Sequence, residues 1–283
     1  MTQSPNVKPA VLITGCSSGL GRAIAQHFVQ AGYPTYATAR RPDSINDLAE
    51  MGCVTLALDV TDENTIKAAV FQVEEKHGAV GILINNAAIG LMTPLEIVPM
   101  ATVRQQYETN VFGLLAVCQA ALPAMRRLGM GRIVNIGSSG GEWTTPAGGV
   151  YQATKYAVDS MSDALRMETK AFGVDVVLIE PGAISSNFAK NGAVIRDDGG
   201  PYEQLMRGVE KLTSQAVEPG APGTWTPEQV AKRVFHASVT NRPRTRYRVG
   251  FVSKILIKMR VWLPDRVWDR MFMSSLNRIG RNL

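Results

Sequence analysis

VLITGCSSGLG, residues 11–21, is the most informative segment of the chain. Its first three residues form a continuous apolar run that predicts a buried strand, and the pattern over residues 20–31 predicts a helix. Between them, glycines allow a sharp turn and a close approach of backbone amides to a ligand, and the helix N-terminus favours an anion. The spacing is neither GxGxxG nor that of a P-loop, which carries a lysine. We therefore expect a pyrophosphate site formed by Gly15, Ser17, Ser18, Gly19, Leu20 and Gly21.

Strands and helices alternate along the rest of the chain. Further strands are predicted at residues 35–38, 54–58, 81–84, 133–136, 174–179 and 245–249, the last of edge type, and helices at 62–77, 102–127, 151–172 and from Thr226-Pro227 onward. An irregular stretch rich in Gly and Pro is expected over residues 181–226. Strands without polar alternation, separated by helices, predict an α/β fold with a doubly wound parallel sheet of the Rossmann type. Another α/β fold remains the alternative, because a strand count does not fix topology.

The end of the second predicted strand indicates which dinucleotide is bound. Arg40 and Arg41 stand there, and no Asp or Glu occurs from Tyr36 to Pro42. NAD enzymes usually carry a carboxylate at this place for the ribose 2′-hydroxyl, whereas a guanidinium suits a 2′-phosphate. We expect NADP (NADPH) rather than NAD, with Arg40 as the contact, unless both arginines are solvated loop residues. Asp59 and Val60 end the third strand, where Asp59 would either meet the adenine or cap the next helix.

Further motifs follow in a fixed order. After the glycine turn come Asn85-Asn86-Ala87-Ala88, Asn110, Ser138, Tyr151-Gln152-Ala153-Thr154-Lys155 and Pro181-Gly182. Over about residues 8–250 this order resembles the short-chain dehydrogenase/reductase family, and most closely its members acting on 17β-hydroxysteroids, retinol and acyl-dihydroxyacetone phosphate. The resemblance implies an NADP-dependent oxidoreductase that moves a hydride between the cofactor and an alcohol or carbonyl carbon.

The chemistry of that reaction explains the residue types. Carbonyl reduction by hydride needs a proton for the forming alkoxide, and oxidation needs the reverse. Tyr151 and Lys155 are four residues apart and so share one helix face, where the ammonium would lower the tyrosine pKa from near 10. By resemblance, Ser138 hydrogen-bonds the substrate oxygen, Lys155 also holds the nicotinamide ribose, and Asn110 holds a water on the proton path. Ser139 is an alternative to Ser138, and the alternative for Asn110 is that it simply caps or kinks its helix.

The resemblance also assigns a second set of residues to the cofactor. These are Asn86, Ala87, Tyr151, Lys155, Pro181, Gly182, Ile184 and Ser186. Two positions depart from the family pattern. Ala88 stands where the usual Asn-Asn-Ala-Gly run has glycine, which adds a methyl group near the ribose, and Ser186 replaces a threonine whose hydroxyl reaches the nicotinamide carboxamide.

The expected substrate is small and apolar. The loop after Ser138, residues 88–96 and the segment 183–225 should line its pocket, and they supply Met92, Trp143, Phe188, Tyr202 and Leu205. Such a lining suggests a steroid, a retinoid or a lipid-like ketone or aldehyde, unless these residues only pack the segment onto the domain. By resemblance, the helices 102–127 and 151–172 form a homodimer. A catalytically silent NADP-binding sensor or scaffold is the competing function, and it leaves the intact catalytic residues unexplained.

Charge and cysteine content narrow the class further. The net charge of +6 arises from residues 241–283, which contain 11 Lys/Arg and 2 Asp/Glu. The high pI is therefore a property of one segment and not a sign of nucleic-acid binding. Cys16, Cys53 and Cys118 lie far apart without a CxxC pair, which predicts no metal site and no disulfide framework. With a polar start that lacks an apolar signal core, the expected location is cytoplasmic.

Residues 251–283 extend beyond the expected main domain, residues 8–250. Apolar residues recur there at helical spacing with Lys and Arg between them, and Pro264 interrupts the pattern. This predicts two short basic amphipathic helices. The extension would either cap the domain or a dimer interface, or dock on an anionic membrane and make the protein peripheral to it.

Overall fold

The computed structural model describes residues 8–281 except residues 187, 189–192 and 196. Its centre is one sheet of seven parallel strands in the order β3-β2-β1-β4-β6-β7-β9, with β9 at an edge as predicted. The strands are β1 (Val11–Ile13), β2 (Thr35–Ala39), β3 (Val54–Ala57), β4 (Ile82–Asn85), β6 (Gly131–Ile136), β7 (Val174–Pro181) and β9 (Arg246–Val249). The order reverses between β1 and β4, which places the turn after β1 in the crevice where doubly wound sheets bind ligands.

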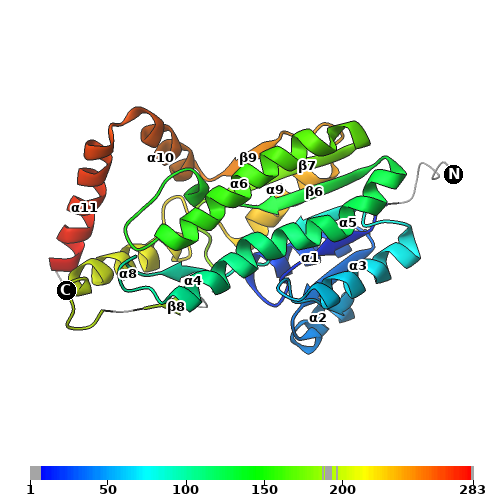
Figure 1. The fold of residues 1–283 in the computed structure, drawn as a ribbon, viewed down its shortest axis with the longest axis horizontal. Helices are drawn as coiled ribbons and strands as arrows, with labels where there is room; N and C mark the ends of the chain where they lie inside the picture. Colours follow the sequence, from blue (N-terminus) through cyan, green and yellow to red (C-terminus); the bar gives the residue numbers. More distant parts are fainter. Residues whose placement is uncertain (1–7, 187, 189–192, 196, 282–283) are drawn as a thin grey trace.

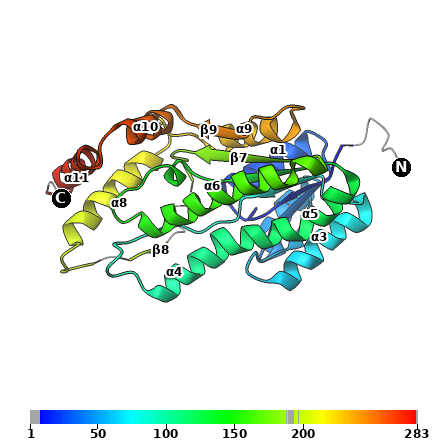
Figure 2. The same ribbon diagram turned by 45° about the horizontal axis from the view of Figure 1, so that its top comes forward.

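Helices cover both faces of this sheet, which confirms the doubly wound α/β prediction (Figures 1 and 2). One face carries α1 (Gly19–Gln30), α2 (Asn46–Glu50) and α9 (Pro227–Val239), and the other carries α3 (Glu63–His77), α5 (Leu114–Leu128) and α6 (Gly149–Thr169). Phe28 and Val234 are fully buried on the first face, and Val117 and Val158 on the second. Helix α9 begins as predicted, with Thr226 as its N-cap in a capping box.

The helix predicted over residues 102–127 contains one irregular turn. α4 (Met100–Tyr107) leads through a π-helical turn, η2 (Glu108–Gly113), into α5. Length and composition alone would allow this continuous helix to cross a membrane, but 44% of its most apolar window is buried inside the protein, so we assign it to the core. Short 3₁₀ turns are η1 (Pro42–Ile45), η3 (Ser139–Gly141) and η4 (Lys170–Phe172).

The stretch over residues 181–226 is partly regular, so the prediction of an irregular segment is wrong. Its elements are β8 (Ala193–Val194), which pairs with β5 (Leu91–Met92), and the helix α8 (Glu203–Val217). α8 buries Met206 and Val209. Gly208 lets another helix approach closely, because a Cβ there would lie 2.7 Å from the carbonyl oxygen of Leu276. The apolar residues of α8 therefore serve a partner that is distant in sequence.

That partner is the second helix of the C-terminal extension. The two predicted helices are present as α10 (Phe251–Trp262) and α11 (Asp265–Arg281), on either side of Pro264. α11 lies alongside α8, as Figure 2 shows at the end of the molecule away from the N-terminus. Trp268 and Leu276 of α11 are buried, at 5% and 3% exposure. α11 therefore caps the domain, whereas α10 leaves much of its surface exposed.

Candidate active site

The glycine turn follows β1 and opens α1. Gly15 and Gly19 have φ angles of +74° and +56°, in the left-handed region that favours glycine. Gly21 is packed so closely that a Cβ there would lie 2.3 Å from the carbonyl oxygen of Gly15. Ser17 and Ser18 are exposed at the start of α1, and the Ser18 side chain makes no capping hydrogen bond with the described residues. An uncapped helix N-terminus behind a tight turn fits the pyrophosphate of a dinucleotide.

Thr14 ties this turn to the end of β4. Its hydroxyl oxygen accepts hydrogen bonds from the amides of Asn86 and Ala87, both at 3.0 Å. The Asn86 side-chain nitrogen donates to the carbonyl oxygens of Thr14 and Gly15, also at 3.0 Å. Leu20 packs on the apolar core beneath the turn. The structure thus brings Asn86 and Ala87 to the glycine turn. It also adds Thr14 to the site residues, and the sequence signal for Thr14 was its place directly after an apolar strand.

Ala88 is accommodated without backbone strain. Among the described non-glycine residues only Ala147 has a positive φ, of 61°, so Ala88 has dihedrals that alanine allows. The strained Ala147 lies between Ser138 and Tyr151, and its carbonyl oxygen accepts from the Thr93 amide at 2.7 Å. This bond holds the loop after β6 against the segment after β4.

The end of β2 lies beside the glycine turn, because the Cys16 amide donates to the carbonyl oxygen of Thr38 at 2.8 Å. Arg40 and Arg41 follow directly and are both exposed. Their guanidinium groups are therefore accessible at the edge of the nucleotide crevice. Arg22, which sequence reasoning missed, donates to a carbonyl oxygen of the glycine turn at 3.3 Å. Its place in the first turn of the predicted helix was the only signal for it.

Asp59 braces the turn between β3 and α3. Its carboxylate accepts from the amide and the hydroxyl of Thr61, at 2.9 and 2.8 Å. The N-cap of α3 is Asp62, whose side chain accepts from a helix amide, so Asp59 is not the cap. Val60 is buried against Gly113, where a Cβ would lie 2.6 Å from the Val60 carbonyl oxygen.

Three predicted site residues lie between the end of β6 and the first turns of α6: Ser138, Tyr151 and Lys155. Ser138 follows β6, and its side-chain oxygen accepts from the Gly140 amide at 3.1 Å. The Ser138 side chain also lies close enough to the Tyr151 hydroxyl to lower its pKa, an effect that is not assigned to Ser139. The Lys155 ammonium donates to the carbonyl oxygen of Ile136 at 2.9 Å and lies 5.9 Å from the centroid of the Tyr151 ring. The structure therefore brings the three predicted groups together.

Burial determines the protonation of this group. Burial raises the pKa of Tyr151 above its usual 10, and the hydrogen bond from Ser138 only partly opposes that effect. The net shift is therefore upward, against the expected lowering by the ammonium, because burial is its largest cause. Burial lowers the pKa of Lys155 to about 8. At neutral pH the phenol keeps its proton and the ammonium keeps its charge.

Asn110 lies in the π-helical turn and is 1% exposed. Its side-chain oxygen accepts from the Ile89 amide at 2.8 Å, and its nitrogen donates to the Ile89 carbonyl oxygen at 2.9 Å and the Thr154 hydroxyl at 3.1 Å. Asn110 therefore links the loop after β4 to the helix that carries Tyr151. π turns often occur at functional sites because they redirect a side chain out of the regular helix.

The segment after β7 closes the far side of the crevice. The Gly182 amide donates to the Val249 carbonyl oxygen at 2.9 Å, directly after Pro181. Ile184 forms a bridge with Trp225. The side chains of Ser186 and Phe188 reach back toward the site: a Cβ on Gly19 would lie 3.6 Å from Ser186, and the Phe188 ring centroid is 5.9 Å from that of Tyr151. Residues 187, 189–192 and 196 of the predicted substrate segment lie outside the described residues.

Most of the predicted pocket residues pack the extension against the domain. Met92, Tyr202 and Leu205 pack on the buried cluster that α8 forms with α11. Trp143, after Ser138, stacks on Phe272 of α11 with ring centroids 5.7 Å apart. These contacts match the alternative that the residues pack a segment onto the domain and do not line a substrate pocket. The helix that they pack against is α11.

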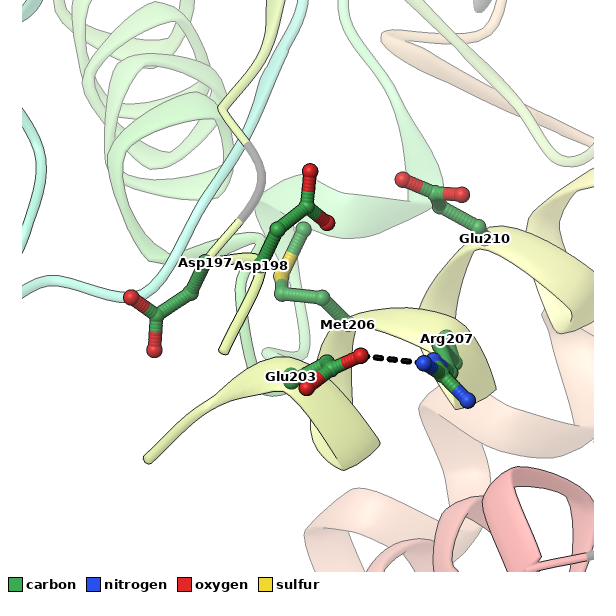
Figure 3. A pocket seen from close by; sticks show the side chains of 6 residues that line it. All are labelled: Asp197, Asp198, Glu203, Met206, Arg207 and Glu210. Carbon is green, nitrogen blue, oxygen red and sulfur yellow. Dashed lines mark hydrogen bonds and ion pairs between the residues drawn. The ribbon is translucent and has the colours of Figure 1, made fainter. Parts of the chain in front are cut away.

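A hollow beside α8 is too acidic to be the apolar pocket. It has a volume of about 210 Å³ and is lined by Asp197, Asp198, Glu203, Met206, Arg207 and Glu210 (Figure 3). Glu203 and Arg207 form an ion pair across one helical turn. The lining does not include Ser138, Tyr151 or Lys155.

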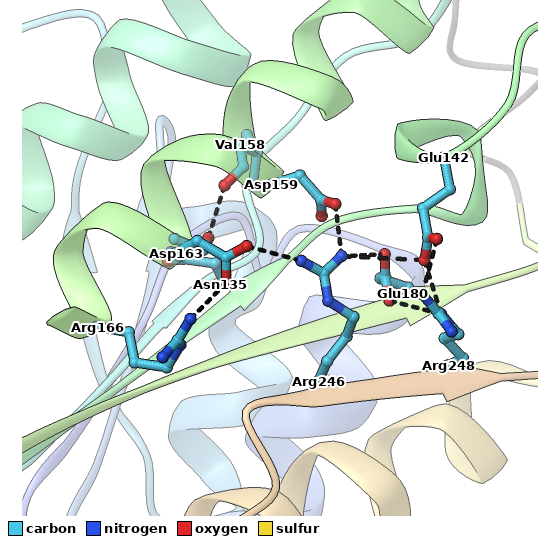
Figure 4. Close-up of polar contacts among 10 residues, drawn as sticks. Asn135, Glu142, Val158, Asp159, Asp163, Arg166, Glu180, Arg246 and Arg248 are labelled. Carbon is cyan, nitrogen blue, oxygen red and sulfur yellow. Dashed lines mark hydrogen bonds and ion pairs between the residues drawn. The ribbon is translucent and has the colours of Figure 1, made fainter.

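Sequence reasoning also missed a cluster of charges behind the catalytic helix (Figure 4). It joins Glu142, Asp159, Asp163 and Glu180 to Arg246 and Arg248. Arg246 lies 2.9 Å from the Glu180 carboxylate, which is fully buried. Burial, together with the neighbouring Glu142 and Asp159, raises the pKa of Glu180 to about 8. The cluster fixes β9 to β7 and α6, directly beside Pro181.

Comparisons with known proteins agree with this geometry. A family model described as short chain dehydrogenase matches residues 9–193. The 3-ketodihydrosphingosine reductase of Bacteroides thetaiotaomicron is 33% identical over 264 residues, covering 91% of this chain and 94% of that protein. The NADPH-dependent 3-dehydrocapnine reductase of Ornithobacterium rhinotracheale is 32% identical over 286 residues, covering 95% and 97%.

Solved structures share the whole architecture. A short-chain dehydrogenase from Streptomyces avermitilis is 29% identical, with a TM-score of 0.80 over 98% of this chain and 99% of that one. A serine dehydrogenase with NADP+ is 27% identical (TM-score 0.74, 86% and 95% covered). A short-chain dehydrogenase/reductase from Burkholderia phymatum with NAD has the same fold at 21% identity (TM-score 0.75, 89% and 92% covered), so the fold alone does not choose the dinucleotide. The chain belongs to the short-chain dehydrogenase/reductase family and is an oxidoreductase acting on CH–OH or C=O groups.

Proposed function

We propose that this enzyme transfers a hydride between NADP(H) and the alcohol or carbonyl carbon of an apolar, lipid-like substrate, with Tyr151 as general acid and base. The observation that carries the proposal is the contact of the Tyr151 hydroxyl with Ser138, next to the buried Lys155 ammonium. Because the pKa of Tyr151 is raised, the phenol carries its proton at neutral pH and has it available for the carbonyl oxygen, as carbonyl reduction requires. Steroids and retinoids remain within the proposed substrate class.

The chain's own residues supply the proton and hold the substrate. The bound dinucleotide supplies the hydride to the carbonyl carbon. The Ser138 hydroxyl holds the carbonyl oxygen next to Tyr151, whose proton passes to that oxygen, so that a C=O group becomes CH–OH. The Lys155 charge stabilises the tyrosinate left behind until a proton returns. Asn110 would hold the water on that return path.

Cofactor binding is assigned to the crevice between β1 and β4. The pyrophosphate would be held by Gly15, Ser17, Ser18, Gly19, Leu20 and Gly21. The adenosine side would be held by Asn86, Ala87, Asp59 and Val60. The nicotinamide would be held by Pro181, Gly182, Ile184 and Ser186. The exposed guanidinium of Arg40 suits a 2′-phosphate. The name of one relative, an NADPH-dependent reductase, agrees with this preference.

The same proposal includes where the enzyme acts and with what partners. Two relatives are named as reductases of 3-ketodihydrosphingosine and 3-dehydrocapnine, which favours a lipid-like ketone. Its three cysteines are free and buried, as suits a cytoplasmic protein. A homodimer would form through helices 102–127 and 151–172. Residues 251–283 would make peripheral contact with a membrane.

Initial rates with purified enzyme test the proposal. A panel of apolar ketones and aldehydes should be reduced with NADPH in preference to NADH. Tyr151→Phe should lower kcat by roughly 10²-fold or more and leave NADPH binding intact, because only the proton donor is lost. Tyr156→Phe, one residue from Lys155 on the same helix, is the matched control and should keep its activity. A preference for NADH, or an active Tyr151→Phe enzyme, would refute the proposal.

A further inference from the structure

The outer face of α10 is the most exposed apolar surface among the described residues. Trp262, Val261 and Phe251 are its most exposed large side chains, at 83%, 74% and 73%. Successive residues of an α-helix are about 100° apart around the axis. Phe251, Ile255 and Trp262 therefore share one face of this helix. An apolar row of this kind, presented to water, is uncommon on a soluble domain and indicates a binding surface.

The opposite face of α10 fixes its orientation. Ser253 and Ile257 are buried, at 6% and 3% exposure. Ser253 packs on the segment that follows β7, because a Cβ on Gly182 would lie 2.0 Å from its hydroxyl oxygen. α10 therefore lies firmly on the domain beside the proposed nicotinamide side of the crevice. Its apolar row is directed outward by this packing.

Cations flank the apolar row. Lys254 and Lys258 are exposed on α10, and residues 251–264 contain no Asp or Glu. Over residues 251–283 there are seven Lys/Arg and two Asp/Glu. A helix with exposed aromatic residues beside lysines matches the boundary of an anionic bilayer, where apolar side chains enter the acyl region and cations meet lipid phosphates.

The neighbouring helix α11 exposes its apolar residues less than α10 does. Its most exposed ones are Val267 and Met273, at 45% and 38%. Trp268 contacts Arg260 and the ring of Trp143, and Leu276 is buried against α8. Both helices lie at the end of the molecule that carries α8 (Figure 1). α11 thus packs on the domain near the loop after Ser138. α10 presents its apolar row to water next to α11.

We propose that the outer face of α10, with Phe251, Ile255 and Trp262 inserted and Lys254 and Lys258 on the surface, docks the enzyme on an anionic bilayer. Docking would place the crevice next to the membrane, from which a lipid-like ketone partitions. The delivery of substrate by docking rests on the proposed function, whereas the docking surface itself does not. The insertion would be shallow, about 5–10 Å, as for interfacial helices.

Sedimentation of the full chain with vesicles tests the proposal without any substrate. Vesicles of phosphatidylcholine with phosphatidylglycerol should bind the enzyme, and vesicles of phosphatidylcholine alone should bind it at least about 10-fold more weakly. The double variant F251S/W262S should lose binding about 10-fold or more. The control M51S/F71S removes two exposed apolar side chains elsewhere (38% and 64% exposed) and should bind normally. Quenching of tryptophan by brominated lipid should disappear in Trp262→Phe.

Several outcomes would overturn this assignment. Equal binding of F251S/W262S and the wild type would show that another surface docks. A wild type that stays in the supernatant would exclude the bilayer. Loss of a higher oligomer in F251S/W262S, without any vesicle binding by the wild type, would make this face a contact between copies of the chain.

An activity assay separates this proposal from the proposed function. F251S/W262S should reduce a water-soluble ketone as fast as the wild type and reduce a ketone embedded in anionic vesicles several-fold more slowly. An enzyme that binds vesicles through α10 but reduces no ketone would retain the docking assignment and refute the proposed function. Equal rates of F251S/W262S and the wild type on the embedded ketone would refute the delivery role of docking.

Discussion

Two groups on one face of α6, the buried Lys155 and the partly exposed Tyr151, carry the proposed proton transfer. Lys155 is 4% exposed, and burial lowers its pKa to about 8, whereas burial raises that of Tyr151. A charged ammonium that has lost its water disfavours the folded state. The residue that supports proton transfer therefore reduces the free energy of unfolding, a common feature of active sites.

Replacement of this lysine should separate activity from stability. Lys155→Met should abolish reduction and raise the free energy of unfolding at pH 7.5 by roughly 1–2 kcal/mol, after allowance for the lost bond to Ile136. The folded-state pKa, about 8, lies below the reference value of 10.5. Between these values the unfolded chain binds the extra proton, so wild-type stability gains with rising pH. The advantage of the variant should largely disappear at pH 9.5, measured by urea unfolding, because the wild type gains roughly 2 kcal/mol over this range.

Lys67→Met is the matched control for that measurement. Lys67 is exposed and pairs only with Glu63 across one helical turn, so its replacement should change stability little at either pH. A Lys155→Met protein that is less stable than the wild type at pH 7.5, or whose advantage is independent of pH, would contradict the account of burial.

At the scale of elements, the edge strand β9 is held by charge. Arg246 bridges the carboxylates of Asp159 and Asp163 on α6 and Glu180 on β7 (Figure 4). Without this arginine, the three carboxylates would face one another in a partly buried place. The remaining cations would be Arg166 on Asp163 and Arg248 on Glu180. Breaking such a network costs far more than breaking an exposed pair.

Arg246→Met should therefore destabilise the protein by roughly 2–4 kcal/mol at pH 7.5, as read from the urea midpoint. The loss should be smaller at pH 5, because burial and acidic neighbours raise the pKa of Asp159 as well as that of Glu180, which reaches about 8. More of these carboxyls carry a proton at pH 5 than at pH 7.5 and then need the arginine less. Arg207→Met breaks an exposed pair on α8 and should cost well under 1 kcal/mol. A similar, small effect of both variants would show that the cluster is not what holds β9.

The elements that the sequence predicted are those whose signal is local. Continuous apolar strands and the glycine turn identify the sheet, and the spacing of Tyr151 and Lys155 identifies the catalytic face. Helix α8 was missed because its apolar residues serve α11, nearly 70 residues further along, and lie between Gly- and Pro-rich turns. The Arg246 cluster was missed for the same reason: its partner Asp159 is 87 residues away. The tyrosine pKa was misjudged because sequence spacing reports a neighbour and not the extent of burial.

For the whole molecule, the surface formed by α5 and α6 is the proposed place of self-association. Phe112 of the π turn before α5 is exposed at 53%, and Tyr156 and Met167 of α6 are exposed at 43% and 65%. Apolar side chains on two adjacent helices provide the kind of patch that a symmetric dimer buries.

Light scattering should give a mass of about twice the chain's 30.7 kDa. Met167→Arg, which would bury a charge in the interface, should shift the protein toward the mass of one chain at micromolar concentration. Phe71→Arg on α3 places the same charge at a similarly exposed site outside this surface and should leave the dimer intact. A single-chain mass for the wild type would contradict the dimer.

The π turn that carries Asn110 has a consequence for the geometry of this site. A π turn differs from an α turn by one inserted residue, so deleting one residue within Glu108–Gly113 would rotate α4 by about 100° relative to α5. Such a rotation would break the link from Asn110 to Ile89 and Thr154. The geometry of this site therefore depends on the number of residues in the turn as well as on their side chains.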